Sequence, residues 1–221
     1  ADLHLVSSRP AADRVVRMGE RPATVHVTGC PSVDLAADIL ESPDLDFDPI
    51  RKYGGVGARL DLDAGYLVVM QHPVTTEFDH ARQHVEETLK AVTALGRPTL
   101  WFWPNPDAGS DGTSRGLRSY RERHTDVPIH FFKNMEPHDF LRLLHNSSCL
   151  VGNSSVGIRE CSFLGVPTVN IGSRQAGRDR GPNVVDVPYE ADAIEAAIRK
   201  QLASDRPARD ALYGSGDAGV K

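Results

Sequence analysis

The amino-acid sequence predicts an α/β protein built on a doubly wound parallel sheet. Short apolar runs alternate along the chain with amphipathic segments of helical length. The central runs are apolar at successive positions, as strands are when helices cover both faces of their sheet. Strands and helices that alternate at this spacing form βαβ units, which make neighbouring strands parallel. We expect residues 1–221 to form a single domain of this kind.

The composition is that of an ordinary globular protein. The hydrophobic content is 40%, the charged content is 25% and the net charge is -5, so nothing favours a nucleic-acid or an anionic membrane partner. No apolar run approaches the roughly 20 residues of a membrane span, and the N-terminus lacks the pattern of a signal peptide. The three cysteines lie in apolar surroundings. We interpret them as reduced, buried thiols of a cytoplasmic protein.

The apolar runs define the expected strands, and the segments between them define the expected helices. Strands are predicted at 3–7, 25–28, 66–71, 99–103, Ile129–Phe132, 148–151, 167–171 and Val184–Val187. Helices are predicted near 9–19, 32–40, 77–95, 111–124, 137–146, 155–164 and 190–203.

Local signals refine some of these boundaries. Thr76 and Asp79 resemble a capping box at the start of the helix near 77–95, and Gly96 is expected to end that helix. Residues 41–63 are rich in Asp, Pro and Gly and are expected to form an irregular excursion. Residues 204–221 are expected to be a tail cut short in the middle of a connection.

In open α/β sheets, ligands bind beyond the carboxyl ends of the strands. The strongest signal at such a position is GNSSVGIRE (152–160), in which small residues join a strand to a helix. The exposed N–H groups and the hydroxyls of Ser154 and Ser155 would form an anion site. Glu160, about one turn further on, would suit the two hydroxyls of a ribose. Capping of the helix without any ligand is an equal alternative.

His72 is expected at the tip of the strand 66–71, because Pro73 prevents that strand from continuing. A histidine at this position can bind a phosphate or transfer a proton. The alternative is a histidine that only hydrogen-bonds a neighbouring loop.

The glycine-rich segment after the strand 167–171 carries Arg174, Arg178 and Arg180. Because they are expected near a helix start that could bind an anion, these arginines favour phosphate recognition. They could instead pair with Glu160, Asp179 and Asp186 in a surface network.

Two further loops follow strands at the same edge. PNPDAGS (104–110) and FFKNMEP (131–137) are both compatible with plain connections, although the second could present its backbone to a flat base. Together the strand ends favour a phosphate-bearing ligand, most naturally a nucleotide. The dinucleotide and P-loop fingerprints are absent, and the histidine pairs His80/His84 and His138/His145 do not make a metal site.

At this point the sequence resembles a known family. GCPSVD (29–34), QHPVTTE (71–77), PNPDAGS (104–110), GNSSVGIRE (152–160), GVPTVNIGSRQAGR (165–178) and GPNVVDV (181–187) follow the order and spacing of the hydrolysing UDP-N-acetylglucosamine 2-epimerases. The resemblance covers nearly the whole chain. It implies the C-terminal, Rossmann-like, UDP-binding half of a two-domain fold of the glycosyltransferase-B type.

The resemblance also implies roles for individual residues. His72 matches the family histidine that contacts the diphosphate and is needed for turnover. Ser154 and Ser155 match serines that bind phosphate, Glu160 matches the glutamate on the ribose, and Arg174 matches an arginine near the nucleotide.

Two weaker correspondences complete the implied site. Met135 falls where the backbone of family members meets the uracil, and Asn105 falls where a polar residue faces the cleft. The implied reaction is elimination of UDP from UDP-N-acetylglucosamine followed by hydration to N-acetylmannosamine. It requires neither a metal nor another cofactor.

In the family, the carboxylates that transfer protons belong to an N-terminal half that this sequence lacks. We therefore expect the chain alone to bind UDP weakly without turnover, and the full-length protein to form homo-oligomers. The alternatives are a UDP-sugar-dependent glycosyltransferase of the same fold and a non-catalytic UDP-sugar-binding module.

Overall fold

The computed structural model describes residues 1–105 and 109–221. Its body is a seven-stranded sheet in the order β3-β6-β5-β4-β7-β8-β9. The strands are β3 (Val56–Gly57), β4 (Leu67–Met70), β5 (Thr99–Phe102), β6 (Ile129–Phe132), β7 (Cys149–Gly152), β8 (Thr168–Ile171) and β9 (Val184–Val187). All neighbours pair in parallel except β3 and β6. The predicted doubly wound parallel sheet is thereby confirmed.

The strand order places a switch point between β4 and β7. From β4 the chain moves outward through β5 to β6, and it then returns to β7 and continues through β8 to β9. The connections that leave β4 and β7 therefore run in opposite directions, which opens a crevice at the carboxyl ends of these two strands.

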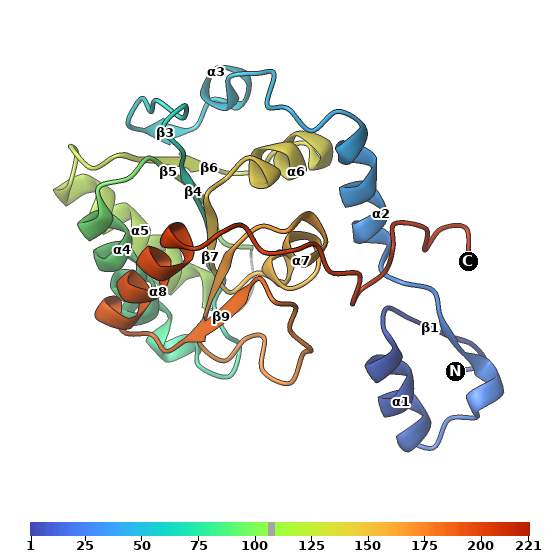
Figure 1. Cartoon of the computed structure of the whole chain (residues 1–221). Helices are drawn as coiled ribbons and strands as arrows, with labels where there is room; N and C mark the ends of the chain where they lie inside the picture. The colour runs from blue at the N-terminus through green and yellow to red at the C-terminus, as the bar shows by residue number, and fades with distance from the viewer. Residues whose placement is uncertain (106–108) are drawn as a thin grey trace.

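Helices cover both faces of the sheet (Figure 1). One layer contains α4 (Ala81–Leu95), α5 (Ser110–Arg123) and α8 (Ala191–Ala203), and the other contains α2 (Pro31–Asp38), α6 (Pro137–His145) and α7 (Glu160–Leu164). Alternate strand residues pack in two separate cores. Val69 and Trp101 belong to the core beneath α4, α5 and α8, and Val68 and Leu100 belong to the core beneath α2, α6 and α7. The residues of the central strands are consequently buried on both faces, as the sequence predicts.

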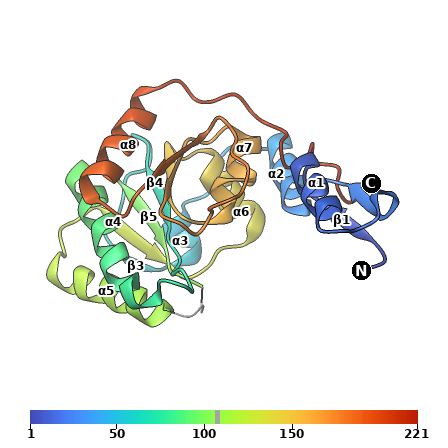
Figure 2. The same ribbon diagram turned by 90° about the horizontal axis from the view of Figure 1, so that it is seen from below.

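The first two predicted strands form a sheet of their own. β1 (His4–Val6) pairs in parallel with β2 (Val25–Val27), and α1 (Arg9–Arg17) connects them. Figures 1 and 2 show this unit to one side of the main sheet, next to the C-terminal end of the chain. Its apolar side chains are poorly covered, and Leu5 is 64% exposed. The expectation of a single domain over residues 1–221 stays a prediction.

Asp179, in the loop between β8 and β9, joins the N-terminal unit to the body. Arg14 of α1 donates two hydrogen bonds to its carboxylate, each 2.8 Å long. The same guanidinium lowers the pKa of the Asp179 carboxyl. From the tail, Tyr213 donates a hydrogen bond to the backbone oxygen of Asp179. The tail 204–221 and α1 therefore hold the same loop.

Some boundaries differ from the predictions. α4 begins at Ala81 after a 3-10 turn (Phe78–His80), and no side chain caps it, so the predicted Thr76–Asp79 capping box is wrong. The reason is a tight turn in which the Glu77 N–H bonds the carbonyl oxygen of Val74. Gly96 does end the helix, in the left-handed conformation.

The excursion 41–63 is not wholly irregular. It contains a short helix, α3 (Pro49–Tyr53), and β3, which adds an antiparallel edge strand to the sheet. The predicted helix at 155–164 is divided, because a 3-10 turn (Ser155–Gly157) precedes α7.

Gly152 provides a test of the switch-point packing. Its φ is +134°, and a Cβ added there would lie 2.1 Å from the backbone oxygen of Met70. We expect Gly152→Ala to lower the free energy of unfolding by about 3 kcal/mol or more. Gly177→Ala is the matched control, because Gly177 also has a positive φ but meets no atom within 4 Å. Its cost should be only the backbone strain, about 1 kcal/mol. Equal midpoints for the two variants in urea unfolding would contradict this prediction.

Candidate functional site

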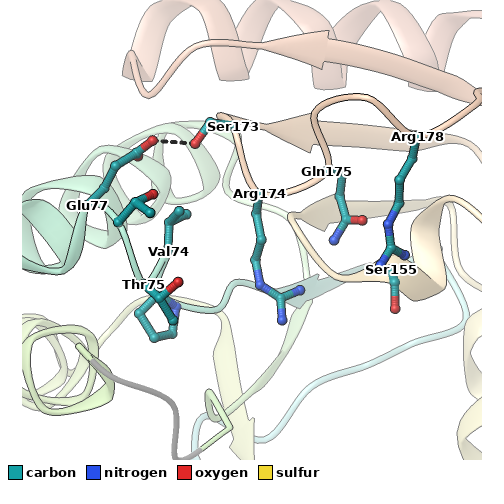
Figure 3. Close-up of a pocket in the computed structure, with 10 residues that line it drawn as sticks. Val74, Thr75, Glu77, Ser155, Ser173, Arg174, Gln175 and Arg178 are labelled. Carbon is teal, nitrogen blue, oxygen red and sulfur yellow. Dashed lines mark hydrogen bonds between the residues drawn. The ribbon is translucent and has the colours of Figure 1, made fainter. Parts of the chain in front are cut away.

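A cleft of about 590 Å³ lies where β4, β7 and β8 end (Figure 3). Three segments line it: the loop after β4, the start of the turn after β7, and the loop after β8. The lining residues are Pro73, Val74, Thr75, Thr76, Glu77, Ser155, Ser173, Arg174, Gln175 and Arg178. The cleft therefore lies beyond the carboxyl ends of the strands, where the sequence predicts a ligand, and it includes the switch point between β4 and β7.

Asn153 fixes the three strand ends relative to one another. Its side-chain oxygen accepts a hydrogen bond from the His72 N–H at 2.7 Å, and its side-chain nitrogen donates to the His72 carbonyl at 2.8 Å. Its own carbonyl oxygen accepts from Gln175 at 2.7 Å and from Arg174 at 3.2 Å. Asn153 is fully buried. One residue thus ties the ends of β4 and β7 to the loop after β8.

His72 is buried beside the cleft, immediately before Pro73. Its Nδ1 lies 3.2 Å from the backbone nitrogen of Asn105, which can only donate a hydrogen bond. Nδ1 is therefore the acceptor, and the neutral ring carries its proton on Nε2. A ring in this state can donate one hydrogen bond to a phosphate oxygen.

The helix start after β7 combines a cap with a cleft wall. Ser154 accepts a hydrogen bond from the Val156 N–H, which is the capping role that the sequence left open. Ser155 lines the cleft, and its hydroxyl accepts from Arg159 at 3.1 Å. The structure therefore separates the two serines, because only Ser155 belongs to the cleft wall.

The three arginines of the loop after β8 also separate. Arg174 and Arg178 line the cleft, as phosphate recognition requires. Arg180 instead pairs with Asp186 and donates to the carbonyl oxygens of Gln175 and Arg178. For Arg180, the alternative of pairing with an acidic residue is therefore correct. Its contacts with the two carbonyl oxygens also brace the loop from within.

Glu160 begins α7, is 6% exposed and is not among the residues that line the cleft. Its carboxylate lies 3.5 Å from the guanidinium of Arg159. In the described part of the chain, its Oε2 has no hydrogen-bond partner although it is buried. Its contact is the ion pair with Nε of Arg159, 3.5 Å away, and ligand hydroxyls could add the hydrogen bonds that a buried carboxylate oxygen requires.

Asn105 and Met135 do not line the cleft. Asn105 is exposed and holds the His72 ring through its backbone. Met135 is buried, and its N–H already donates to the side-chain oxygen of Asn134. Residues 106–108 of the PNPDAGS motif lie outside the described residues.

Sequence reasoning missed three features of the site. It gave Asn153 no individual role, it did not predict the hydrogen bond from Arg159 to Ser155, and it did not foresee the hydrogen bond from Ser173 to Glu77 across the cleft. For Asn153, the available signal was its position directly after the glycine that ends a strand. The other two join residues whose proximity depends on tertiary packing.

The described residues contain no cluster of side chains suited to a metal ion. Within the same residues, no helix is both long and apolar enough to cross a membrane. The cleft wall instead offers hydroxyl, amide and guanidinium donors, and this combination suits an anion such as a diphosphate.

Comparisons with known proteins agree with this chemistry. The profile of the family described as UDP-N-acetylglucosamine 2-epimerase matches residues 1–221. A protein of that name from Neisseria meningitidis serogroup B is 32% identical over 97% of this chain and 54% of its own length. A UDP-N,N'-diacetylbacillosamine 2-epimerase (hydrolyzing) from Legionella pneumophila is 30% identical over 96% of this chain and 54% of its own length. The chain thus spans about half the length of these relatives.

A solved structure shows the same fold. The Methanocaldococcus jannaschii UDP-GlcNAc 2-epimerase, in complex with UDP-GlcNAc and UDP, superimposes with a TM-score of 0.72 at 15% identity. The match covers 99% of this chain and 59% of that one. On the evidence of the family profile and of the aligned relatives, the chain belongs to the UDP-N-acetylglucosamine 2-epimerase family.

Proposed function

We propose that this chain is the UDP-binding part of a hydrolysing UDP-N-acetylglucosamine 2-epimerase. The observation that carries the proposal is the convergence of Ser155, Arg174 and Arg178 on one cleft at the switch point of the sheet. Support comes from the relatives, of which the Legionella protein is named as hydrolyzing, and from the UDP in the Methanocaldococcus complex.

In this proposal the diphosphate lies in the cleft between the helix start and the loop after β8. Arg174 and Arg178 neutralise its charge, and Ser155 contributes a hydroxyl. His72 donates a hydrogen bond through Nε2–H, because Asn105 occupies Nδ1. Oε2 of Glu160, which accepts no hydrogen bond within the described residues, accepts from the ribose hydroxyls.

Met135 and Ser154 take lesser parts in the proposal. The N–H of Met135 is engaged by Asn134, so a uracil at this position would be met by the Met135 carbonyl. Ser154 acts through its cap, which fixes the turn that presents the backbone N–H groups to phosphate.

The proposed reaction is an elimination followed by a hydration. A base removes the proton from C2 of the sugar, the bond from C1 to the diphosphate oxygen breaks, and water then adds to the resulting glycal. The products are UDP and N-acetylmannosamine. The cationic cleft lowers the barrier because it stabilises the negative charge that develops on the departing diphosphate.

UDP binding tests the cleft directly. We expect Arg174→Ala to raise the Kd of this chain for UDP at least tenfold, because a charge-assisted hydrogen bond to phosphate is lost. Arg199→Ala makes the same change in net charge on α8, outside the cleft, and should leave the Kd within about twofold. Isothermal titration with UDP measures both. A wild-type chain that does not bind UDP would refute the proposal.

The ribose contact has its own test. We expect the wild-type chain to prefer UDP over 2'-deoxy-UDP, and Glu160→Gln to reduce this preference about tenfold while keeping the shape of the side chain. The ratio of the two dissociation constants is the readout, so any general loss of affinity cancels. A ratio that is the same in both proteins would place the ribose away from Glu160.

Turnover is expected to fail in this chain by itself. Among the described residues that line the cleft, Glu77 is the only carboxylate, and it accepts a hydrogen bond from Ser173. Proton removal at C2 and protonation of the product need further acid and base groups. Proton NMR of the chain with UDP-N-acetylglucosamine should therefore detect no N-acetylmannosamine. Release of that sugar would contradict this prediction, and transfer to an added acceptor would favour a glycosyltransferase.

A further inference from the structure

The cleft is electrically asymmetric along its length. Figure 3 shows Glu77 and Ser173 at one end, Arg178 and Ser155 at the other, and Arg174 between them. Thr75 and Thr76 belong to the same loop as Glu77 and add hydroxyl groups to the cleft wall. One end is therefore cationic, and the other is anionic and rich in hydroxyls.

The carboxylate of Glu77 limits what the anionic end can accept. A phosphate placed there would be repelled, since two like charges a few ångströms apart in a partly solvated cleft interact unfavourably. A neutral group with hydroxyl donors would instead be attracted, because an ionised carboxylate is a strong acceptor.

The position of Glu77 leaves one oxygen available for this purpose. The Ser173 hydroxyl donates to Oε1 of Glu77, which ties the loop after β4 to the loop after β8. Among the described residues, no hydrogen bond engages Oε2. The Ser173 contact thus orients the carboxylate and leaves the second oxygen for a ligand.

We propose that Glu77, with Thr75, Thr76 and Ser173, forms the subsite for the sugar of the nucleotide sugar, and that Glu77 selects neutral sugars over anionic ones. This inference rests on the proposed function, because the cationic end must hold the diphosphate. It adds a specificity-determining residue: Glu77 makes nucleoside diphosphate sugars with a neutral, hydroxyl-bearing sugar bind more tightly than those with a uronate.

The competing role for Glu77 is a purely structural tie between two loops. Glu77→Gln distinguishes the two roles, since the amide oxygen of glutamine can still accept from Ser173 while the charge is removed. Thermal unfolding and circular dichroism of the variant verify that the loops remain folded. Glu86→Gln on α4 is the matched control: it makes the same change at a carboxylate that pairs with Arg82, outside the cleft.

The decisive measurement compares UDP-glucose with UDP-glucuronate, which differ only at C6 of the sugar: a neutral hydroxymethyl group in the first and a carboxylate in the second. We expect the wild-type chain and the Glu86→Gln control to bind UDP-glucose about three- to tenfold more tightly than UDP-glucuronate. Glu77→Gln should bring the two dissociation constants to within about twofold. Its Kd for UDP should stay within about threefold of the wild-type value, because the diphosphate does not contact Glu77.

The outcomes separate the two levels of inference. Suppose that the wild-type chain binds UDP, but that the ratio of the dissociation constants for UDP-glucose and UDP-glucuronate is the same in Glu77→Gln as in the wild type. The sugar subsite is then overturned and the UDP site stands. If Glu77→Gln weakens the binding of UDP as much as it weakens the binding of UDP-glucose, Glu77 is a structural tie and the subsite is again overturned. If the wild-type chain does not bind UDP, the proposed function and this inference fall together.

Discussion

The geometry of the cleft depends on the pair of hydrogen bonds between the carboxamide of Asn153 and the backbone of His72. The carboxamide accepts from the N–H of His72 and donates to the carbonyl of the same residue, so two hydrogen bonds hold the end of β4 against the end of β7. A side-chain amide carries its donor and its acceptor on two separate atoms, so it can bond both groups of the His72 backbone at once. An aspartate would face the His72 carbonyl with a second acceptor, and a leucine would leave buried backbone groups unpaired.

From this junction the charges of the cleft acquire their positions. The carbonyl of Asn153 holds Arg174 and Gln175, and Arg180 braces the same loop through the carbonyls of Gln175 and Arg178. After β7, the buried Glu160 pairs with Arg159, which also donates to Ser155 of the cleft wall. Cationic groups that are held in place before an anion arrives need little reorganisation to bind it.

Much of the fold could be predicted from the sequence, because strands buried on both faces are apolar along their whole length. Several features could not, and two of them show why. The pattern of β1 and β2 predicts strands but does not say which sheet they join, because strand pairing depends on contacts between distant segments. The start of α4 was also misplaced, since the turn at Val74–Glu77 competes with the cap that Thr76 would have made.

By itself the sequence determined the α/β alternation, the positions of the polar motifs at the strand ends, and the residue types suited to an anion. Tertiary structure alone decided which of those residues share a cleft. It separated Ser155 from Ser154 and Arg174 from Arg180, and it gave Asn105 a backbone role in orienting the ring of His72. The physical reason is that local patterns record a residue's burial and turn chemistry, whereas a hydrogen bond between residues 81 positions apart, such as that of His72 with Asn153, exists only once the sheet has formed.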